Sequence, residues 1–402
     1  MHLDVRLHGE SVGTLEARGA FVRFYFNDNY LESRDRSVLG LKFEEDVTRE
    51  YTSQDRLPSW FENLLPEGSL KQLVEAELRT ILGRTPSQME VLLQVGSDLP
   101  GAVTVEPYEG AVGVRQRFPL SEQTVAQREL GPWLTSAVAG VGLKFSVLRQ
   151  DEKFVAPATG SDGDWLVKLP DPQFRLLPQN EFASMGLGRR VGINVPAVRL
   201  VSRDELEGVP DRFWRGETEA FVIERFDREN GARTHIEDFA QVRGLRVDDR
   251  YAGNFETLAG YVWRRSRDED LIEFVRRLTL NLMIGNDDAH LKNWSVRYSD
   301  RKRAELSPVY DVVSVQVYDS AGLERGTGLK LANSRRYEDV NLAAFDRIGR
   351  KIGYHTIDLR DVVRETVGLI ETNWSEYESD LRDDSFVRRV REHKEQMKRR
   401  LS

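Results

Sequence analysis

The sequence predicts an α+β protein with a β-rich N-terminal part and a mainly helical C-terminal part. Apolar and polar residues alternate in residues 3–7 and 21–26, as they do in half-buried strands. Between residues 113 and 226, short strand-like runs surround one helical stretch. Beyond about residue 230 the apolar residues recur at helical spacing. The clearest such stripe is Leu271, Phe274, Val275, Leu278 and Leu282.

The N-terminal part is expected to form a small module over residues 1–110. Its strands place Leu3, Val5 and Leu7 on one face. A helix is predicted within residues 58–82, because Leu70, Leu73, Val74 and Leu78 recur at helical spacing after a Pro-Glu-Gly-Ser start signal at residues 66–69. A second helix is predicted at residues 90–95, and Gly and Pro then mark a return to strand.

Two further domains are expected, a mixed lobe over residues 111–228 and a helical lobe over residues 229–402. The mixed lobe contains strand-like runs at residues 142–149 and 164–170, a helix beginning near residue 180, and two more strands at residues 195–201 and 219–227. Strands followed by one helix and further strands are typical of a small α+β lobe.

The composition excludes several classes of partner and of functional site. The 58 Lys and Arg against 66 Asp and Glu give a net charge of −8, which argues against broad attraction to nucleic acids or anionic membranes. The absence of cysteine excludes disulfides, thiolate metal sites and a thiol nucleophile. No apolar run approaches the roughly 18 residues of a membrane span, and no signal segment is evident. We therefore expect a cytoplasmic protein.

A polar loop follows the apolar helix that ends at Gly285. It presents Asp287, Asp288, His290, Lys292 and Asn293. So many hydrogen-bonding groups after a buried helix are costly unless they bind ligands or one another. Asp288 and Asn293 have the D-x4-N spacing of a kinase catalytic loop, in which the Asp accepts a hydroxyl proton and the Asn binds magnesium.

Asp311 lies 18 positions beyond Asn293, where a second metal-binding carboxylate is expected. Mg²⁺ prefers oxygen ligands and retains water, so one carboxylate, one amide oxygen and nucleotide phosphates form a sufficient site. His290 is interpreted as bonding backbone or bridging to phosphate, with a metal role as the alternative.

The mixed lobe offers partners for a nucleotide. Gly140 and Gly142 precede a strand, where backbone N–H groups could approach phosphates, although a plain hairpin also fits. Lys168 lies in a strand from which its ammonium could neutralise phosphates, and a solvent-facing lysine is the alternative. Glu181 is expected to begin the next helix, where it could orient Lys168 or simply favour the helix dipole.

Together these motifs resemble the HipA family of bacterial serine/threonine kinase toxins over nearly the whole chain. The matching segments are WFENLLPEG (60–68), GSDLPGAVTV (96–105), the Gly-rich turn with Lys144, LVKLP (166–170), NEF (180–182), GINVP (192–196), ERFDR (224–228), IGNDDAHLKN (284–293) and PVYDVVS (308–314). The resemblance implies a two-lobed fold related to phosphoinositide-type kinases, preceded by a β-rich subdomain.

The resemblance also implies roles for individual residues. Asp288 is similar to the catalytic base, Lys168 to the phosphate-binding lysine, and Asn293 and Asp311 to the ligands of Mg²⁺. The implied ATP-binding residues of the covering loop are Ala139, Gly140, Val141, Gly142, Leu143 and Lys144. Lys168 is implied to bind phosphate, and the implied adenine connector consists of Glu224, Arg225 and Phe226. The implied contacts with the nucleotide and its metal are His290, Leu291, Lys292, Asn293, Tyr310 and Asp311.

Two positions depart from the family pattern. Ala137 stands where a regulatory serine is common, which puts autophosphorylation there in doubt although Ser136 and Ser146 are near. Gly142 stands where glutamine is common, so the loop is expected to be more flexible.

The resemblance further implies a toxin that arrests growth by phosphorylating an aminoacyl-tRNA synthetase, with glutamyl-tRNA synthetase favoured. Its expected partner is a HipB-like helix-turn-helix antitoxin, which would make contact with DNA mainly indirect. A catalytically weak scaffold that tunes the antitoxin's repression is the alternative, and a small-molecule kinase is a third hypothesis. The basic C-terminal segment, residues 386–402, is expected to be a solvated helix, with DNA or antitoxin contact as the alternative.

Overall fold

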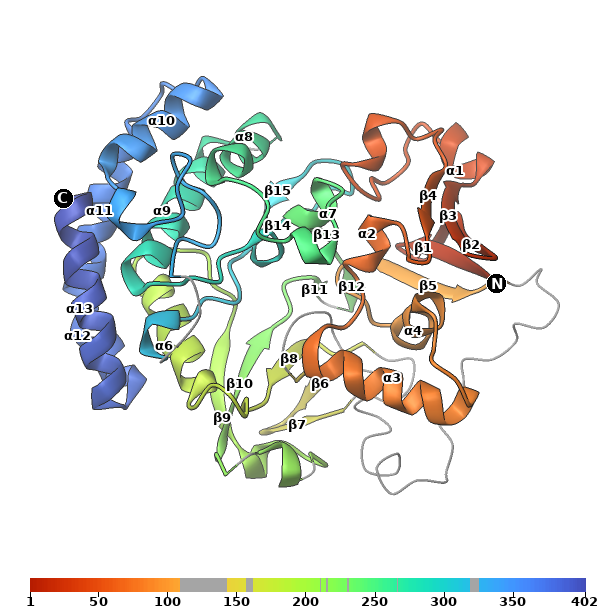
Figure 1. The fold of residues 1–402 in the computed structure, drawn as a ribbon, viewed down its shortest axis with the longest axis horizontal. Helices are drawn as coiled ribbons and strands as arrows, with labels where there is room; N and C mark the ends of the chain where they lie inside the picture. The colour runs from red at the N-terminus through yellow and green to blue at the C-terminus, as the bar shows by residue number, and fades with distance from the viewer. Residues whose placement is uncertain are drawn as a thin grey trace. The chain divides into compact units, whose positions relative to one another are not determined.

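The computed structural model describes residues 1–108, 143–156, 162–209, 211–214, 216–229, 231–265, 267–318 and 325–402. The chain divides into two compact units (Figure 1). The first comprises Met1–Pro172, Val201–Val247 and Arg297–Lys302, and the second comprises Gln173–Leu200, Asp248–Val296 and Arg303–Ser402. Each unit therefore contains segments from distant parts of the sequence.

The first unit begins with an antiparallel five-stranded sheet of order β4-β3-β2-β1-β5. Its strands are β1 His2–Leu7, β2 Glu10–Arg18, β3 Phe21–Phe26, β4 Tyr51–Gln54 and β5 Val103–Pro107. Val5 pairs with Gly13 on one side and Val105 on the other. Leu3, Val5 and Leu7 are buried as predicted. Alternation along β1 thus produced the expected apolar face.

Four helices accompany this sheet: α1 Asp28–Glu32, α2 Ser59–Glu62, α3 Gly68–Leu82 and α4 Gln88–Val95. The helices predicted within residues 58–82 and at residues 90–95 are confirmed as α3, which begins at Gly68, and α4. The second begins two residues earlier than predicted because Ser87 and Glu90 form a capping box. An aromatic cluster of Phe24, Phe43, Trp60 and Phe61 fills the core here.

A second sheet has five strands in the order β7-β6-β8-β10-β9, and its pairs β7-β6, β6-β8 and β8-β10 are antiparallel. Its strands are β6 Lys144–Gln150, β7 Lys153–Val155, β8 Trp165–Lys168 and β10 Glu219–Glu224, while β9 Val198–Ser202 continues from the second unit into the first. After β10 the chain forms the hairpin β11 Arg228–Glu229 and β12 Ala232–Arg233, then β13 His235–Asp238 and α7 Phe239–Val242.

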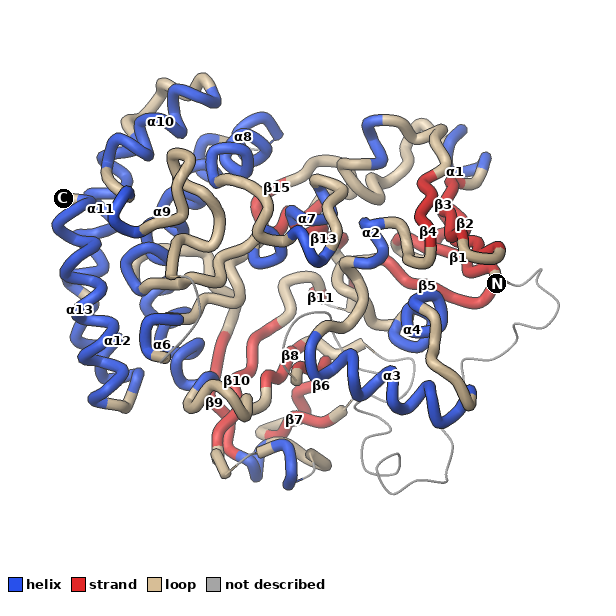
Figure 2. The backbone as a smooth tube through the Cα atoms, in the orientation of Figure 1, coloured by secondary structure: helices blue, strands red, loops and turns tan. Residues whose placement is uncertain are grey.

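The second unit is mainly helical (Figure 2). Its helices are α6 Leu177–Arg190, α8 Phe255–Arg265, α9 Asp268–Ile284, α10 Leu342–Ile352, α11 Leu359–Thr372, α12 Trp374–Leu381 and α13 Asp384–Leu401. The chain after α9 forms β14 Ser295–Tyr298, which runs into the first unit, and β15 Glu305–Leu306. Helix α9 packs against α8, α11 and α13, and its predicted stripe from Leu271 to Leu282 is buried.

Like α4, helix α6 begins earlier than predicted. Helix α6 begins at Leu177, after Leu176 in a left-handed conformation and with Pro178 in the first turn. Proline suits the first turn because its fixed φ is helical and its missing N–H has no partner there. Glu181 therefore lies beyond the first turn, where the helix dipole favours an acidic residue less strongly. In the described part of the chain, no helix is both long and apolar enough to cross a membrane.

Candidate active site

The catalytic-loop candidate begins where α9 ends. Gly285 ends the helix with a φ of +67°, a conformation that glycine adopts at little cost. Its carbonyl accepts a hydrogen bond from the Val315 amide at 3.0 Å. The Ser314 hydroxyl donates to the Ile284 carbonyl at 2.6 Å. These bonds tie the segment that follows Asp311 to the helix end.

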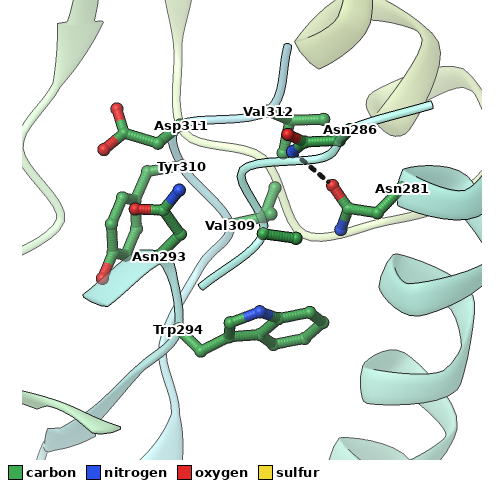
Figure 3. Close-up of a pocket in the computed structure, with 9 residues that line it drawn as sticks. Asn281, Asn286, Asn293, Trp294, Val309, Tyr310, Asp311 and Val312 are labelled. Carbon is green, nitrogen blue, oxygen red and sulfur yellow. Dashed lines mark hydrogen bonds between the residues drawn. The ribbon is translucent and has the colours of Figure 1, made fainter. Parts of the chain in front are cut away.

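A small pocket lies beside this loop within the second unit (Figure 3). It is lined by Asn281, Asn286, Ala289, Asn293, Trp294, Val309, Tyr310, Asp311 and Val312. The Asn286 amide donates to Asn281 Oδ1 at 2.7 Å, and the Asn281 amide donates to the Arg277 carbonyl at 2.8 Å. The turn of the loop is thus anchored on the last turns of α9.

Asp288 and Asn293 are joined through the backbone. The Asn293 side-chain amide donates to the Asp288 carbonyl at 2.8 Å. This bond occupies the amide nitrogen, so Oδ1 is the Asn293 atom that remains to bind a metal. The Asp288 amide in turn donates to Asn286 Oδ1 at 3.1 Å. The Asp288 side chain is 48% exposed. The predicted base is therefore open to solvent while its backbone is fixed.

Asp311 has a φ of +54°, in the left-handed region that few residues other than glycine occupy. Such backbone strain tends to occur at functional sites. Figure 3 shows the Asp311 carboxylate and the Asn293 side chain on the same side of residues 309–312. An amide oxygen and a carboxylate on one side of a pocket fit the oxygen preference of Mg²⁺. The described residues contain no larger cluster of His, Asp and Glu suited to a metal.

The remaining predicted residues of the loop surround this pair. The Tyr310 hydroxyl donates to the Lys292 carbonyl at 2.8 Å and also bonds the Ser295 hydroxyl, so it connects two parts of the site. Leu291 is buried, and its amide donates to the Arg250 carbonyl. The loop is therefore held by backbone bonds on several sides.

His290 is buried, and its Nε2 lies 3.9 Å from Asp288 Oδ1. Burial lowers the pKa of His290, against the opposing effect of Asp288. A neutral imidazole can bond to backbone or phosphate, but it brings little positive charge to the site. Ala289, the residue before it, is approached by Gly328, where a Cβ atom would lie 2.8 Å from the Ala289 backbone.

Sequence reasoning missed the role of Asp287, which precedes the predicted base. Its carboxylate accepts hydrogen bonds from Gln316 at 3.0 Å, Arg325 at 3.1 Å and Tyr337 at 2.6 Å. Burial raises the pKa of Asp287, because it outweighs the effect of these donors. The donors lie 29 to 50 residues away in the chain, so no local pattern could have indicated them.

Sequence reasoning also missed Tyr251, whose hydroxyl donates to Asp288 Oδ1. Tyr251 precedes α8 and lies 37 residues before Asp288. Its only sequence signal is an aromatic residue in a polar segment, which is too common to indicate a site. The contact therefore emerges only from the fold.

The first unit contains the other predicted residues. Lys168 ends β8, where its backbone pairs with Lys144 in β6 and with Phe221 in β10. The Lys168 ammonium lies 5.6 Å from the centre of the Phe221 ring. The fold thus pairs the strand position of the predicted phosphate-binding Lys168 with that of Lys144, the last residue of the predicted covering loop. Leu143 is described, whereas Ala139, Gly140, Val141, Gly142, Ser136 and Ala137 lie outside the described residues.

The predicted adenine connector follows β10. Arg225 is buried, and its guanidinium bonds Asp98 at 2.7 Å, Asp227 at 2.9 Å and Ser146 at 2.9 Å. Burial opposes ionisation of Asp227, but Arg225 and Arg228 outweigh it and hold the pKa of that carboxyl well below its usual range. The Arg225 amide donates to the Asp164 carbonyl. Arg225 therefore anchors the connector.

The same contact affects the possible autophosphorylation of Ser146. Its side chain is fully buried in β6 and accepts a hydrogen bond from Arg225. A hydroxyl in that position is not accessible to a kinase active site.

Comparison with known proteins identifies the family. The model of the HipA-like C-terminal domain matches residues 136–374, which is more than half of the chain, and that of the HipA N-terminal domain matches residues 3–106. The chain belongs to the HipA family. The Sinorhizobium fredii protein named "Putative kinase Y4dM" is 38% identical over 386 residues, covering 92% of this chain and 91% of that protein.

Two further comparisons agree with this family. The serine/threonine-protein kinase toxin HipA of Shewanella oneidensis is 27% identical over 304 residues, covering 66% of this chain and 65% of that protein. A solved complex of HipA, HipB and operator DNA from Shewanella oneidensis MR-1 contains a chain with a TM-score of 0.74 and 22% identity, covering 99% of this chain and 96% of that one. This likeness shows a shared fold.

The family assignment confirms the predicted α+β, kinase-like fold of a HipA-family kinase toxin. It also supports ATP as the phosphoryl donor, since the named relatives are kinases. The residues that contact the nucleotide and its metal stay predictions.

Proposed function

We propose that this HipA-family protein transfers the γ-phosphoryl group of ATP to a serine or threonine hydroxyl of a protein. The observation that carries the proposal is a pocket of the second unit that Asn293 and Asp311 line, together with the bond from the Asn293 amide to the Asp288 carbonyl. An exposed carboxylate beside two oxygen ligands is what phosphoryl transfer requires, because catalysis of this reaction consists mainly of positioning and charge stabilisation.

Asp288 is the proposed base. Its exposed carboxylate would orient the substrate hydroxyl and accept its proton as the oxygen attacks phosphorus. Asn286 and Asn293 fix the backbone of Asp288 and so limit how far the carboxylate can move. Such pre-positioning is a main source of rate enhancement.

Asn293 Oδ1 and the Asp311 carboxylate are the proposed ligands of Mg²⁺. When bound, the ion would supply positive charge next to the phosphate oxygens. Tyr310 holds the Asp311 segment through its bond to the Lys292 carbonyl. The backbone of His290, Leu291 and Lys292 is proposed to contact the nucleotide on the loop side.

Residues of the first unit are also proposed as nucleotide contacts. Lys168 would neutralise phosphate charge, and its neighbour Lys144 belongs to the proposed covering loop with Ala139, Gly140, Val141, Gly142 and Leu143. Glu224 and Phe226 flank Arg225 and are proposed to hold the adenine through backbone groups. The buried bonds of Arg225 to Asp98 and Asp227 would keep that connector rigid.

We propose that the protein acts in the cytoplasm and that its substrate is an aminoacyl-tRNA synthetase, with glutamyl-tRNA synthetase favoured. The proposed result is growth arrest or persistence. The proposed inhibitor is a HipB-like antitoxin, consistent with the HipA, HipB and operator DNA present together in the Shewanella complex. Contact with DNA would be mainly indirect. Helix α13 supports this, since Arg391, Lys394 and Lys398 pair with Glu378 and Glu371 of the same unit.

The test compares wild type with Asp288→Asn, and uses Asp361→Asn, an exposed change on α11, as a control. Transfer of labelled phosphate from ATP to purified glutamyl-tRNA synthetase and to whole lysate is measured with Mg²⁺ present. We expect Asp288→Asn to lose at least about a hundredfold in rate, in the range of general base catalysis, and the control to match wild type.

Each result has a clear meaning. Full transfer by Asp288→Asn, or a wild type that does not bind Mg-ATP in a calorimetric titration, overturns the proposed function. A wild type that binds ATP and a HipB-like protein but phosphorylates nothing supports the scaffold alternative. Transfer to a different single protein would retain the kinase and replace the synthetase as substrate.

A further inference from the structure

Tyr251 makes a contact with Asp288 that the kinase pattern does not contain. Its hydroxyl donates to Asp288 Oδ1. The ring is held from several directions, because His290 packs edge-on at 5.1 Å and the guanidinium groups of Arg335 and Arg250 lie 5.4 Å and 5.6 Å from the ring centre. A ring fixed in this way presents its hydroxyl in one place.

The two oxygens of Asp288 therefore differ. Oδ1 accepts from Tyr251 and lies 3.9 Å from His290 Nε2. Oδ2 has no hydrogen bond to any other described residue, and the side chain is half exposed. A half-exposed carboxylate with a single fixed bond keeps its rotamer only as long as that bond persists. Tyr251 is thus the group that decides which oxygen faces outward.

The direction of the bond is also determined. Burial and the neighbouring charge of Asp288 both raise the pKa of Tyr251, so the phenol stays protonated at neutral pH. It therefore donates to the carboxylate and does not compete for a proton.

We propose that Tyr251 is a positioning residue that holds Asp288 Oδ1 and leaves Oδ2 to receive the proton of the substrate hydroxyl. This inference rests on the proposed kinase function. In the transfer step, the hydroxyl oxygen forms a bond to the γ-phosphorus, the bond from that phosphorus to the bridging oxygen breaks, and ADP leaves. The hydroxyl proton goes to Oδ2, from which it returns to solvent.

The test is Tyr251→Phe, which removes one oxygen and keeps the ring. Tyr354→Phe is the matched control, because its hydroxyl also donates to a carboxylate, Asp268, at 3.3 Å but outside the loop. The readouts are kcat and the KM for ATP, with glutamyl-tRNA synthetase as acceptor or, failing that, the major phosphoprotein found in lysate. Crystal structures of both variants give the rotamer of Asp288.

We expect kcat of Tyr251→Phe to fall between about tenfold and about a hundredfold, as for a displaced catalytic group. The KM for ATP should stay within about twofold, because the substitution removes none of the proposed ATP ligands. The Asp288 carboxylate should occupy more than one rotamer. Tyr354→Phe should match wild type in each readout.

Other outcomes overturn the inference. If Tyr251→Phe has the kcat of wild type while Asp288→Asn is inactive, the kinase function stands and the positioning role is wrong. If kcat and KM change together and the unfolding midpoint also falls, Tyr251 has only a structural role. If wild type itself transfers no phosphate, the proposed function fails and the inference fails with it.

Discussion

Asp287 and Asp288 are adjacent in the chain but have opposite environments. The Asp287 side chain is 10% exposed and accepts three hydrogen bonds, whereas that of Asp288 is 48% exposed and accepts one. The first carboxylate fastens the loop to the chain beyond Asp311, and the second is left open for a substrate. Two identical side chains thus take different roles because their neighbours differ.

The first prediction concerns Asp287. Asp287→Ala leaves the donors Gln316, Arg325 and Tyr337 without their acceptor, so we expect it to lower the free energy of unfolding by about 1–3 kcal/mol. Asp287→Asn should cost less, because an amide oxygen can still accept from Arg325 and burial already disfavours the charge. Urea unfolding of both variants measures the difference. Equal stability of Asp287→Ala and wild type would contradict the fastening role.

The second prediction concerns Asp311. Asparagine tolerates the left-handed backbone at least as well as aspartate, so Asp311→Asn should preserve the fold and remove only the charge. We expect the unfolding midpoint to be unchanged and the affinity for ATP in the presence of Mg²⁺ to fall at least about tenfold, from loss of a carboxylate ligand. Titration calorimetry with and without Mg²⁺ checks this. Wild-type affinity in Mg²⁺ would exclude Asp311 as a ligand.

Much of the fold followed from local patterns. Alternation predicted β1 and β3, and helical spacing predicted α3 and the buried stripe of α9, because these signals repeat every two or every three to four residues. The loop containing Asp288 was also found from sequence, since its polar residues follow a buried helix directly. Tyr251 and the donors to Asp287 were not found, because tertiary folding alone brings them to the loop.

The third prediction concerns Gly328, which has a φ of +67° and packs on the Ala289 backbone. Gly328→Ala would add the strain of a left-handed residue and a Cβ at 2.8 Å from Ala289, between Asp288 and His290. Gly353→Ala is the matched control, because its φ is +75° and its Cβ would meet nothing within 4 Å.

We expect Gly353→Ala to lose about 1 kcal/mol of stability from backbone strain alone. Gly328→Ala should lose more than this control and should also reduce phosphoryl transfer, since the displaced backbone carries the proposed base. Chemical unfolding and transfer rates of the two variants are compared. If both lose the same stability and both keep full activity, the contact with Ala289 is unimportant.

The last prediction concerns pH and the buried carboxyl of Glu237 in the first unit. Burial raises the pKa of Glu237 to about 7, although Tyr298, Trp60 and the Leu41 amide all donate to it. A raised pKa in the folded state means that the stabilising contribution is complete below the unfolded-state pKa of about 4.3. That contribution is then lost as pH rises through about 7.

We therefore expect the free energy of unfolding to decline between about pH 4.3 and about pH 7, the range in which the carboxyl is ionised in the unfolded chain but still protonated in the folded protein. Glu237→Gln cannot ionise at this position, so its free energy of unfolding should decline less steeply with pH than that of wild type. This difference in slope does not depend on how stable the variant is at any single pH. Urea unfolding at several pH values measures both slopes. Parallel curves for wild type and Glu237→Gln would show that Glu237 stays ionised in the folded protein, with its three donors outweighing burial.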